Sequence, residues 1–552
     1  MISSFDIFDT CLLRKCGTPE NFFDVLSLRA FDGKVDEWAR QEFVVARQKA
    51  ESSLSNHPSS TLQDIWMAFG WSHPQLLPPT DLCRIEMELE REMIVPVIRM
   101  CDKVNKCRSK GHRVVFISDM YLSSEFLIDI LSDYGFYKDG DSLYVSCECG
   151  ACKRDGGLFR FVKEKEGTSY RHWHHYGDNC NGDYKVPRQL GIDSTLINNG
   201  YTPYQNRWIK NDCSLGYKYP SISAGLGRAL HHCNIWNTHT DFVLDIVAPF
   251  YCAWMYQVLD DAKKRGVKRL YFCARDAYQI HKIALRMQHL FPDVAIEYVY
   301  MSRQSLYINR DNDEAKISYF QRIGLATKTD KVAIVDTTTS GKTPRILNEI
   351  LQEYGYCPVR SYFIFLWHST EQHEMCNAAI FNDYVALNKS KNNLWSHLFL
   401  IENLFSVNNE LKTVDYCGNE NGEPVFSYER TKEDCIIDDN IDWASEHERL
   451  LAMYTDAFLA LGLQNYANLV FSQIAVPTLY GYLHYPEKDY LELLSSYHSY
   501  FGENKPKPVT YIKKKPLWLV WLKKDRDYLW HRGTIVYNTP RWLNKLFLLI
   551  KG

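Results

Sequence analysis

The sequence predicts an α/β protein with two doubly wound, Rossmann-like domains and a mainly helical C-terminal region. Short β-branched or aromatic runs alternate with helical stretches twice along the 552 residues. Acidic or hydroxyl residues follow these runs, as expected when loops at the carboxyl ends of parallel strands carry the chemistry. We expect four parts: a first domain at 1–195, a linker at 196–235, a second domain at 236–415 and the helical region at 416–552.

Four short segments of the first domain supply the residue types of a phosphoryl-transfer site. They are SFDIFDT at 4–10, VVFISD at 114–119, Lys153, and GDN at 177–179 together with Asp183. A carboxylate is a weak nucleophile towards a dianionic phosphate, so it needs a divalent cation and a lysine to neutralise the charge it approaches. The chain's first half is therefore predicted to be an enzyme.

The order and spacing of these segments resemble the haloacid dehalogenase superfamily. In that family an aspartate attacks phosphorus, a Ser or Thr and a Lys hold the phosphoryl oxygens, and acidic residues hold magnesium. The resemblance implies that Asp6 is the nucleophile and that Ser118 and Lys153, with Thr10, hold phosphate. Oxygen ligands and a phosphate substrate favour Mg²⁺ over zinc, and the implied ligands are Asp6, Asp178 and Asp183.

One position departs from the family pattern. Phosphatases of the superfamily usually carry a second aspartate two residues after the nucleophile as general acid/base, and here that position is Phe8. The next acid is Asp9. Either Asp9 does the proton transfer, or the site is slow, dehalogenase-like or inactive. A lone Asp-x-Phe-Asp after a strand is otherwise a turn or helix cap, an alternative that four segments in the right order disfavour.

A helical insertion separates the first two motifs. Residues 36–54 and 81–110 have helical spacing of apolar residues, and the second stretch ends at Gly111. We expect residues 17–110 to form a cap that excludes water and selects the leaving group of the substrate.

Composition and cysteine usage indicate a cytoplasmic protein. No run of eighteen apolar residues occurs and a strand begins at the N-terminus, so neither a spanning helix nor a cleavable signal is expected. The 17 cysteines then read as reduced thiols. A structural zinc is conceivable because several cysteines and histidines lie near Lys153 and Asp178, but they lack paired Cys-x-x-Cys spacing: Cys147, Cys149, Cys152, His172, His174, His175 and Cys180.

The second domain repeats the alternation of strands and helices. A helix at 242–264 precedes a strand at 269–274, and the turn Arg275-Asp276 leads to a helix at 278–291. Three more strands follow, at 296–301, 332–335 and 361–367. The first of these ends in Ser302-Arg303, and the second ends in Asp336 and the loop TTTSGKT, with a helix to 354. This order predicts a second doubly wound sheet.

The loop after Asp336 is the sharpest signal in this half. Small hydroxyl residues and a glycine at a helix start offer N–H and O–H donors to a phosphate: Thr339, Ser340, Gly341, Lys342 and Thr343. It is not a Walker loop, because Asp336 stands where that motif needs glycine. The pattern resembles the 5-phosphoribosyl diphosphate site of type I phosphoribosyltransferases, which implies that Asp336 holds the ribose hydroxyls. Those enzymes usually have two adjacent acids and a slightly longer loop, so an ordinary capped strand-to-helix turn is the alternative.

Arg275, Asp276, Ser302 and Arg303 end neighbouring predicted strands and could face one crevice. A diphosphate leaving group and its magnesium need such partners, although a strand-end ion pair would look the same. Residues 1–415 as a whole resemble two-module proteins of bacterial polysaccharide gene clusters. The resemblance implies transfer of 5-phosphoribofuranose from phosphoribosyl diphosphate to a lipid-linked glycan of an O-antigen or capsule, followed by removal of the 5-phosphate. The alternatives are a capped sugar-phosphate phosphatase with another sugar donor, or a second half that is a non-catalytic glycan-binding scaffold.

The C-terminal end is basic and rich in tryptophan. The last 52 residues carry a net charge of +9, against −12 for the remainder. Trp518, Trp521, Trp530 and Trp542 alternate with lysines and arginines, which suits peripheral contact with the inner face of an anionic membrane. A terminal helix packed on the core is the alternative. Nucleic acid is disfavoured as a partner, because the basic residues are confined to one short end and no recognised motif accompanies them.

Overall fold

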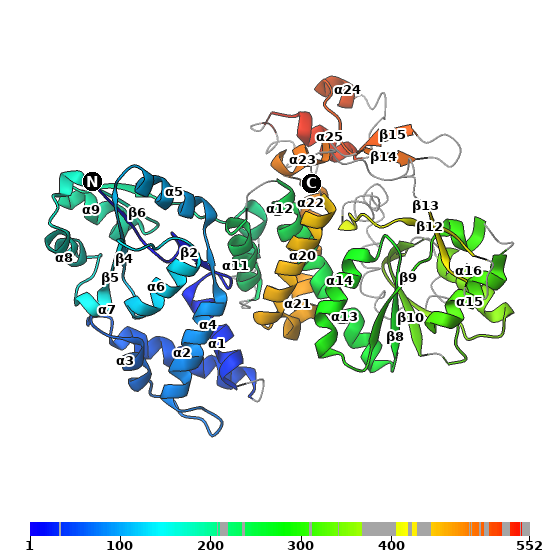
Figure 1. Cartoon of the computed structure of the whole chain (residues 1–552), viewed down its shortest axis with the longest axis horizontal. Helices are drawn as coiled ribbons and strands as arrows, with labels where there is room; N and C mark the ends of the chain where they lie inside the picture. Colours follow the sequence, from blue (N-terminus) through cyan, green and yellow to red (C-terminus); the bar gives the residue numbers. More distant parts are fainter. Residues whose placement is uncertain are drawn as a thin grey trace. The chain divides into compact units, whose positions relative to one another are not determined.

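The structure is a computed structural model. It describes residues 1–31, 35–206, 208–209, 219–234, 238–308, 312–329, 331–339, 342–366, 405–417, 422–427, 443–484, 486, 488–495, 498–501, 507–521, 530–540 and 543. Contacts divide the chain into two compact units, residues 1–236 and residues 237–552 apart from the turn at 460–462. Each unit contains its own parallel sheet (Figure 1), so the α/β class predicted from the sequence is confirmed.

The first unit is built on a five-stranded parallel sheet in the order β5-β4-β1-β6-β7. The strands are β1 (Ile2–Phe5), β4 (Arg113–Ser118), β5 (Ser142–Val145), β6 (Trp173–Gly177) and β7 (Asp193–Leu196). The first strand of the chain is central, and Phe5 pairs with Phe116 of β4 and with Tyr176 of β6. The loops that follow β1, β4 and β6 therefore start side by side at one edge of the sheet.

Helices cover the faces of this sheet, because their apolar sides are removed from water when they pack on the apolar side chains of the strands. They are α5 (Ile98–Ser109), α6 (Ser124–Asp133), α7 (Ser146–Cys149), α8 (Gly157–Glu166) and α9 (Val186–Leu190), with single turns η1 (Tyr170–His172) and η2 (Cys180–Lys185). On one face, Leu158, Phe159 and Val162 of α8 pack against Val115 and Ile117 of β4. This packing holds the strand ends, and so the loops of the site, in place.

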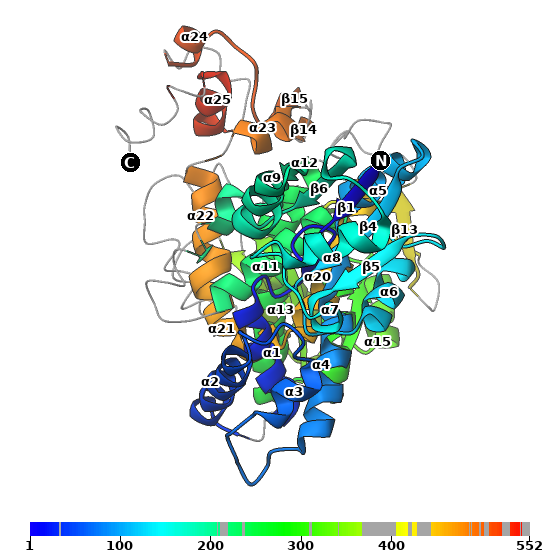
Figure 2. The same cartoon turned by 90° about the vertical axis from the view of Figure 1, so that its left-hand side faces the viewer.

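A helical insertion lies between two short antiparallel strands, β2 (Leu12–Arg14) and β3 (Ile94–Pro96). Its helices are α1 (Pro19–Phe31), α2 (Glu37–Ser53), α3 (Leu62–Met67) and α4 (Pro79–Met93), which both views draw together beside the sheet (Figures 1 and 2). The expected cap at 17–110 is shorter here, since the β2–β3 pair closes it. Helix α5, whose buried face packs on β4, belongs to the sheet layer instead.

Part of the expected linker at 196–235 is an ordered helix. Helix α11 (Tyr219–His232) packs on β2 and β3 and belongs to the first unit. An ideal Cβ on Gly225 would lie 2.3 Å from the backbone nitrogen of Gly17, so this helix approaches the chain too closely for any side chain. The glycine-rich composition that indicated a linker instead permits a close helix contact.

The second unit contains a four-stranded parallel sheet in the order β11-β10-β8-β9. Its strands are β8 (Arg269–Cys273), β9 (Ala295–Val299), β10 (Val332–Thr339) and β11 (Arg360–Leu366). The helices between them are α14 (Tyr278–Met287), η4 (Gln288–Leu290), η5 (Gln304–Ile308), α15 (Asp313–Ile323) and α16 (Lys342–Glu353). After β8 the chain adds β9 on one side and then crosses to place β10 on the other. The order therefore reverses between β8 and β10.

The C-terminal helices do not form a part of their own. Helices α20 (Trp443–Ala460), η8 (Leu463–Tyr466), α21 (Ala467–Val470), η9 (Phe471–Ala475) and α22 (Val476–His484) belong to the second unit with α12 (Thr238–Phe242), η3 (Val243–Val247) and α13 (Ala248–Lys264). Helix α21 packs directly on α13. The prediction of a mainly helical C-terminal region is confirmed among the described residues of 416–552. This region was also expected to be a separate part, whereas its described helices pack into the core of the second unit.

One helical stretch, His239–Lys264, has the length and composition of a membrane span. The sequence had indicated none. Within the second unit 89% of its most apolar window is buried, as in the core helix of a globular unit. Its apolar residues are therefore accounted for by packing against the neighbouring helices.

Two hairpins and three short helices complete the second unit. The hairpins are β12 (Lys412–Tyr416) with β13 (Pro424–Ser427), and β14 (His498–Phe501) with β15 (Lys507–Thr510); the helices are α23 (Lys488–Ser495), α24 (Leu517–Trp521) and α25 (His531–Asn538). The first hairpin precedes α20 and the second follows α23. Trp530 is buried, whereas Trp518 is 63% exposed. Trp542 lies outside the described residues, and membrane contact through this end stays a prediction.

Candidate active sites

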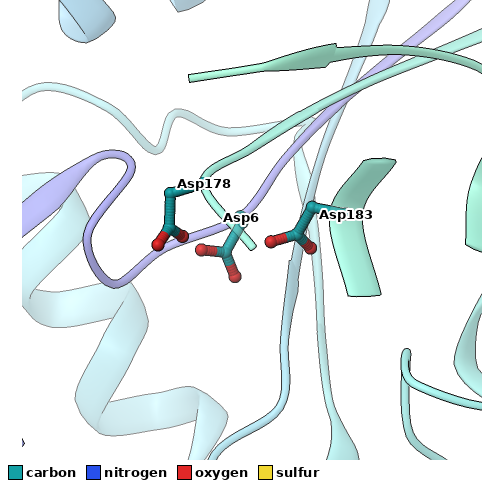
Figure 3. Close-up of side chains that lie close together, drawn as sticks. All are labelled: Asp6, Asp178 and Asp183. Atoms are coloured by element: carbon teal, nitrogen blue, oxygen red, sulfur yellow. The ribbon is translucent and has the colours of Figure 1, made fainter. Parts of the chain in front are cut away.

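Three carboxylates meet at the edge of the first sheet. Asp6 follows β1, Asp178 follows β6, and Asp183 lies in the η2 turn; one oxygen from each lies within 4.8 Å of the others (Figure 3). Asp6 and Asp183 are buried. An ideal Cβ on Gly177 would lie 2.4 Å from the Asp183 carboxyl carbon, so only glycine lets the η2 turn come this close. The three residues expected as magnesium ligands thus lie together.

Lys153 links two of these acids. Its Nζ lies 2.5 Å from Asp6 Oδ1 and 2.7 Å from Asp183 Oδ1, and all three side chains are buried. Its backbone N–H donates to both carboxylate oxygens of Asp119, at 2.8 and 3.0 Å. Asp119 follows Ser118 at the end of β4, so it holds the lysine loop against the neighbouring strand.

Burial and charge set the protonation of these groups in opposite directions. Burial raises the pKa of Asp6 well above its usual value, and the Asp183 and Asp178 charges add to the rise while Lys153 opposes it. Burial also acts against the charge of Asp183, but Lys153 and a hydrogen bond from His175 hold its pKa below the usual value. Asp183 therefore stays ionised as the partner of Lys153, whereas the ionised form of Asp6 needs further positive charge nearby.

A buried hydrogen-bond chain orients Asp183. Trp173 Nε1 donates to Ser4 Oγ at 2.6 Å, Ser4 Oγ lies 2.7 Å from His175 Nδ1, and His175 Nε2 lies 3.1 Å from Asp183 Oδ1. Burial lowers the pKa of His175, so the ring is neutral, with its proton on Nε2 facing the carboxylate. The sequence had offered His175 only as a zinc candidate, and its alternation with Trp173 along β6 was the signal for a buried role.

Two hydroxyl residues lie at the same edge. Thr10 is buried and donates to Asp178 Oδ1 at 3.3 Å, so it orients an acidic residue. Ser118 is buried at the end of β4. Both were expected to hold phosphate. The structure brings Thr10, in the loop after β1, and Ser118, at the end of β4, to the sheet edge where Asp6 and Asp178 lie.

Asp9 is held by residues far along the chain. Its backbone has a φ of 57°, a left-handed conformation, and Asn199 Nδ2 donates to its carbonyl at 2.7 Å. Arg228 of α11 forms an ion pair with its carboxylate, and Tyr201 OH accepts from the same guanidinium at 3.3 Å. Sequence reasoning missed Asn199 and Arg228, because both lie in the stretch expected to be a linker. Whether Asp9 also transfers protons stays a prediction.

Phe8 takes the place where the family pattern has an acid. The guanidinium of Arg14 lies 4.4 Å from the centre of its ring, and Arg14 pairs with buried Glu90 at 2.7 Å. This cation contact gives the ring a structural role between the nucleophile loop and β2.

The zinc alternative finds no support within the part of the chain that the structure describes. There the three aspartates are the single group of His, Cys, Asp or Glu with metal-binding geometry. His175 is engaged by Ser4 and Asp183, and His174 Nδ1 lies 2.9 Å from Asp193. The cysteines and histidines near Lys153 are thus not gathered around one point.

The second unit has its own cluster of polar residues at a sheet edge. Asp276 follows β8, and Asp336 lies within β10 next to the point where the strand order reverses. Burial raises the pKa of the Cys273 thiol, and the charges of Asp336 and Asp276 raise it further, so both carboxylates lie near that thiol. Ligands of open α/β sheets bind in the crevice at such a reversal.

Arg275, like Asp9, has a left-handed backbone, and these are the two such non-glycine residues in the part of the chain that the structure describes. Its φ is 71°, and its N–H donates to Tyr298 OH at 2.8 Å while its carbonyl accepts from Asn408 Nδ2 at 2.8 Å. Burial raises the pKa of Asp276, and Arg275 and Arg303 oppose that rise. Both arginines therefore lie near the Asp276 carboxylate. Strain of this kind persists where surrounding contacts over-determine a conformation, as they do here.

The structure describes only some of the other residues that were expected to bind the donor in the second unit. Ser302 donates to Thr413 O at 2.6 Å, so its hydroxyl is committed to holding β12. Thr343 is half-buried in the first turn of α16. Ser340 and Gly341 lie outside the described residues, as do the side chains of Thr339 and Lys342.

No family model and no curated protein matches the sequence. The N-terminal portion is similar in fold to solved structures of HAD-type proteins. A HAD phosphatase from Thermococcus onnurineus shares 16% identity, covers 36% of this chain and 86% of its own, and gives a TM-score of 0.28. A HAD family enzyme from Bacteroides thetaiotaomicron shares 15% identity, covers 38% of this chain and 97% of its own, and gives a TM-score of 0.28. A putative HAD hydrolase from Bacillus subtilis, bound to magnesium, shares 16% identity, covers 37% of this chain and 88% of its own, and gives a TM-score of 0.26. At these identities and TM-scores the likeness by itself establishes nothing about activity.

Proposed function

We propose that the first unit is a magnesium-dependent phosphatase that works through Asp6. The observation that carries the proposal is the position of Asp6 at 2.5 Å from Lys153, within one cluster with Asp178 and Asp183. A buried carboxylate beside two other acids is a poor structural choice, because like charges in a buried place destabilise the fold. It is the arrangement that a nucleophile for a charged phosphate needs.

The three aspartates fit magnesium. Carboxylate oxygens are its preferred protein ligands, and Asp183 Oδ2 accepts a single described hydrogen bond, from Asn179 N at 3.0 Å, so a lone pair stays available. Magnesium bound by Asp6, Asp178 and Asp183 would neutralise the phosphate and favour ionised Asp6.

The protein's own residues then carry the reaction. The Asp6 carboxylate attacks phosphorus, the ester P–O bond breaks, and the leaving oxygen departs with the electron pair and takes a proton from water. Lys153 and Ser118 would bind the phosphoryl oxygens, and water then hydrolyses the acyl phosphate on Asp6 to give free phosphate. Phosphate release from ribose 5-phosphate, with and without EDTA, tests this role. Activity that survives complete removal of divalent metal would overturn it.

We infer further that the second unit takes phosphoribosyl diphosphate as a donor and transfers 5-phosphoribose to a glycan. The support is the pair of Asp276 and Asp336 at the reversal of strand order, with Arg275 and Arg303 near Asp276 to meet a diphosphate. The first unit would then remove the 5-phosphate from the product. These two reactions in succession would attach ribofuranose to the glycan. We propose a lipid-linked O-antigen or capsule glycan as the acceptor.

Mass spectrometry of a lipid-linked glycan pool incubated with phosphoribosyl diphosphate and magnesium tests the transfer. A gain of phosphoribose or ribose is expected. Glycan binding without release of diphosphate would instead favour a non-catalytic glycan-binding module.

A cytoplasmic enzyme that acts on a lipid-linked glycan works beside the membrane, and we propose that the basic, tryptophan-rich C-terminal end contacts it. Exposed Trp518 and the lysines at 513–515 support this. A protein lacking the final 40 residues should lose binding to anionic vesicles, and salt should weaken binding by the full chain in part, since charge is screened over roughly 10 Å at 0.1 M salt. Absence of vesicle binding by the full chain at low salt would refute the contact.

A further inference from the structure

A group of aromatic side chains lies beside the Arg275–Asp276 turn. Tyr298 and Tyr300 come from the end of β9 and meet edge to face, with ring centres 5.3 Å apart. Phe426 of β13 stands against Tyr300 at 5.0 Å, and Tyr278 of α14 against Tyr298 at 6.2 Å. All four rings are half-buried. Tyr300 also packs against the core of the unit, so the rings are held in place while part of each stays exposed. Half-buried rings present faces on which a sugar ring can pack.

Glu410 is tied through Asn408 to the same Arg275 turn that Tyr298 contacts. Asn408 Oδ1 accepts from Glu410 N at 3.0 Å, and Asn408 Nδ2 donates to Arg275 O at 2.8 Å. Burial raises the pKa of Tyr300, and the Glu410 charge adds to the rise, so the carboxylate lies near that tyrosine. Its charge acts on Tyr298 in the same direction. Among the residues that the structure describes, the carboxylate of Glu410 makes no hydrogen bond or ion pair.

Glu410 and Asp276 have different charged groups beside them, which suits the two carboxylates to different tasks. Asp276 lies near two arginines, which favour its charged form and suit it to a diphosphate with its metal. Glu410 lies near one cation, Lys282, and a second acid, Glu448; burial comes first among the causes that raise its pKa. Burial raises the pKa of both carboxylates, but Asp276 has two arginines beside it for a charged ligand, whereas Glu410 has a lysine and a second acid beside it and is the better placed to accept a proton.

We propose that the aromatic group of Tyr278, Tyr298, Tyr300 and Phe426 is the acceptor-sugar site of the second unit, and that Glu410 is its general base. This inference rests on the proposed transfer function. In the step, Glu410 takes the proton of the acceptor hydroxyl while that oxygen forms a bond to ribose C1. The C1–O bond to diphosphate breaks, and diphosphate leaves with the electron pair. In the absence of a sugar, water takes the acceptor position and the donor is hydrolysed.

Release of diphosphate from phosphoribosyl diphosphate with magnesium tests the base, measured in water alone and with a panel of octyl glycosides. Glu410→Gln keeps size and removes the proton acceptor, so release should fall about a hundredfold or more under both conditions. Donor affinity by calorimetry should stay within about twofold of the wild-type value, because Glu410 faces the acceptor. The matched control is Glu297→Gln, on an exposed position of β9, which should release diphosphate at the wild-type rate.

The aromatic site is tested by two variants of one residue. Tyr300→Ala should raise the acceptor KM about tenfold, while Tyr300→Phe keeps the ring and should keep the wild-type acceptor KM. Unchanged release by Glu410→Gln, or equal acceptor KM values for Tyr300→Ala and Tyr300→Phe, would overturn the inference. Wild-type protein that binds the donor but never releases diphosphate would also overturn it. Failure to bind the donor would refute the proposed function itself.

Discussion

Lys153 Nζ lies 2.5 Å from Asp6 Oδ1, although the two residues are 147 positions apart. One buried ammonium thus joins the loop after the first strand of the chain to the loop that precedes α8. Because the same nitrogen lies 2.7 Å from Asp183, two carboxylates share its single positive charge. Together with Asp178 the acids can carry more negative charge than one ammonium offsets, and a divalent cation would neutralise this excess.

The nucleophile assignment predicts the effect of Asp6→Asn. The change keeps the size of the side chain and removes the attacking charge, so release of phosphate from ribose 5-phosphate should fall roughly a thousandfold or more. Transfer by the second unit should persist, and an unchanged melting temperature of the first unit would show that the variant is folded there. Phosphate release at the wild-type rate would mean that another group is the nucleophile. Asp9→Asn, assayed in parallel, shows whether Asp9 supplies acid/base catalysis.

The close approach of α11 to Gly17 predicts that Gly225→Ala destabilises the first unit. Alanine is the better helix former by about 1 kcal/mol, but its Cβ would lie 2.3 Å from backbone, and overpacking of this kind costs roughly 1–3 kcal/mol. We expect a lower melting temperature and lower phosphatase turnover, because α11 carries Arg228 to Asp9. Gly70→Ala is the control, since nothing lies within 4 Å of an ideal Cβ there. Equal melting temperatures for the two variants would contradict the predicted contact.

The separation into two units predicts that Asp336→Ala affects one activity alone. The donor's ribose hydroxyls lose their acceptor, so transfer of phosphoribose should be abolished while phosphate release by the first unit continues. Thr343→Ala should weaken donor binding by a smaller amount, as it removes one hydroxyl at the start of α16. Both activities can be measured on the same preparation by phosphate and diphosphate release. Loss of both together would indicate misfolding or a single shared site.

A buried histidine pair in the second unit predicts acid sensitivity. His447 Nε2 lies 3.0 Å from Phe405 O and must donate there, so its Nδ1 accepts from His239 Nε2 at 3.2 Å. Burial lowers the pKa of His447 from 6.5 to about 4. The unfolded chain therefore takes up a proton before the folded one does, and the free energy of unfolding should fall as the pH drops from about 6.5 to about 4.

The size of this loss is on the order of 3 kcal/mol for His447. Urea unfolding at pH 7.5 and at pH 4 measures it, with His447→Gln as the reference that keeps polar contacts but cannot titrate. The wild-type protein should lose more stability than the variant across this interval. Equal losses would show that His447 is accessible to protons in the folded state.

The sequence by itself determined the elements and the strand-end chemistry. An apolar strand followed by a polar residue is a local pattern, and parallel strands place all their carboxyl ends at one edge, so the neighbourhood of Asp6, Ser118 and Asp178 followed from order and spacing. The helical cap and the second sheet followed from periodicity in the same way. Their exact limits did not, because the β2–β3 pair that closes the cap depends on residues about 80 positions apart.

The tertiary structure alone decided which side chains meet across long distances. Arg228 reads as a solvated residue of a linker, yet α11 brings it to Asp9, and His175 acquires its role only when Ser4 and Asp183 flank it. The helices after residue 442 look like a separate region, yet they complete the core around α13. The local pattern of apolar residues predicts which face of a segment will be buried. Which partner buries it is set by packing of the whole unit, and no local period encodes that choice.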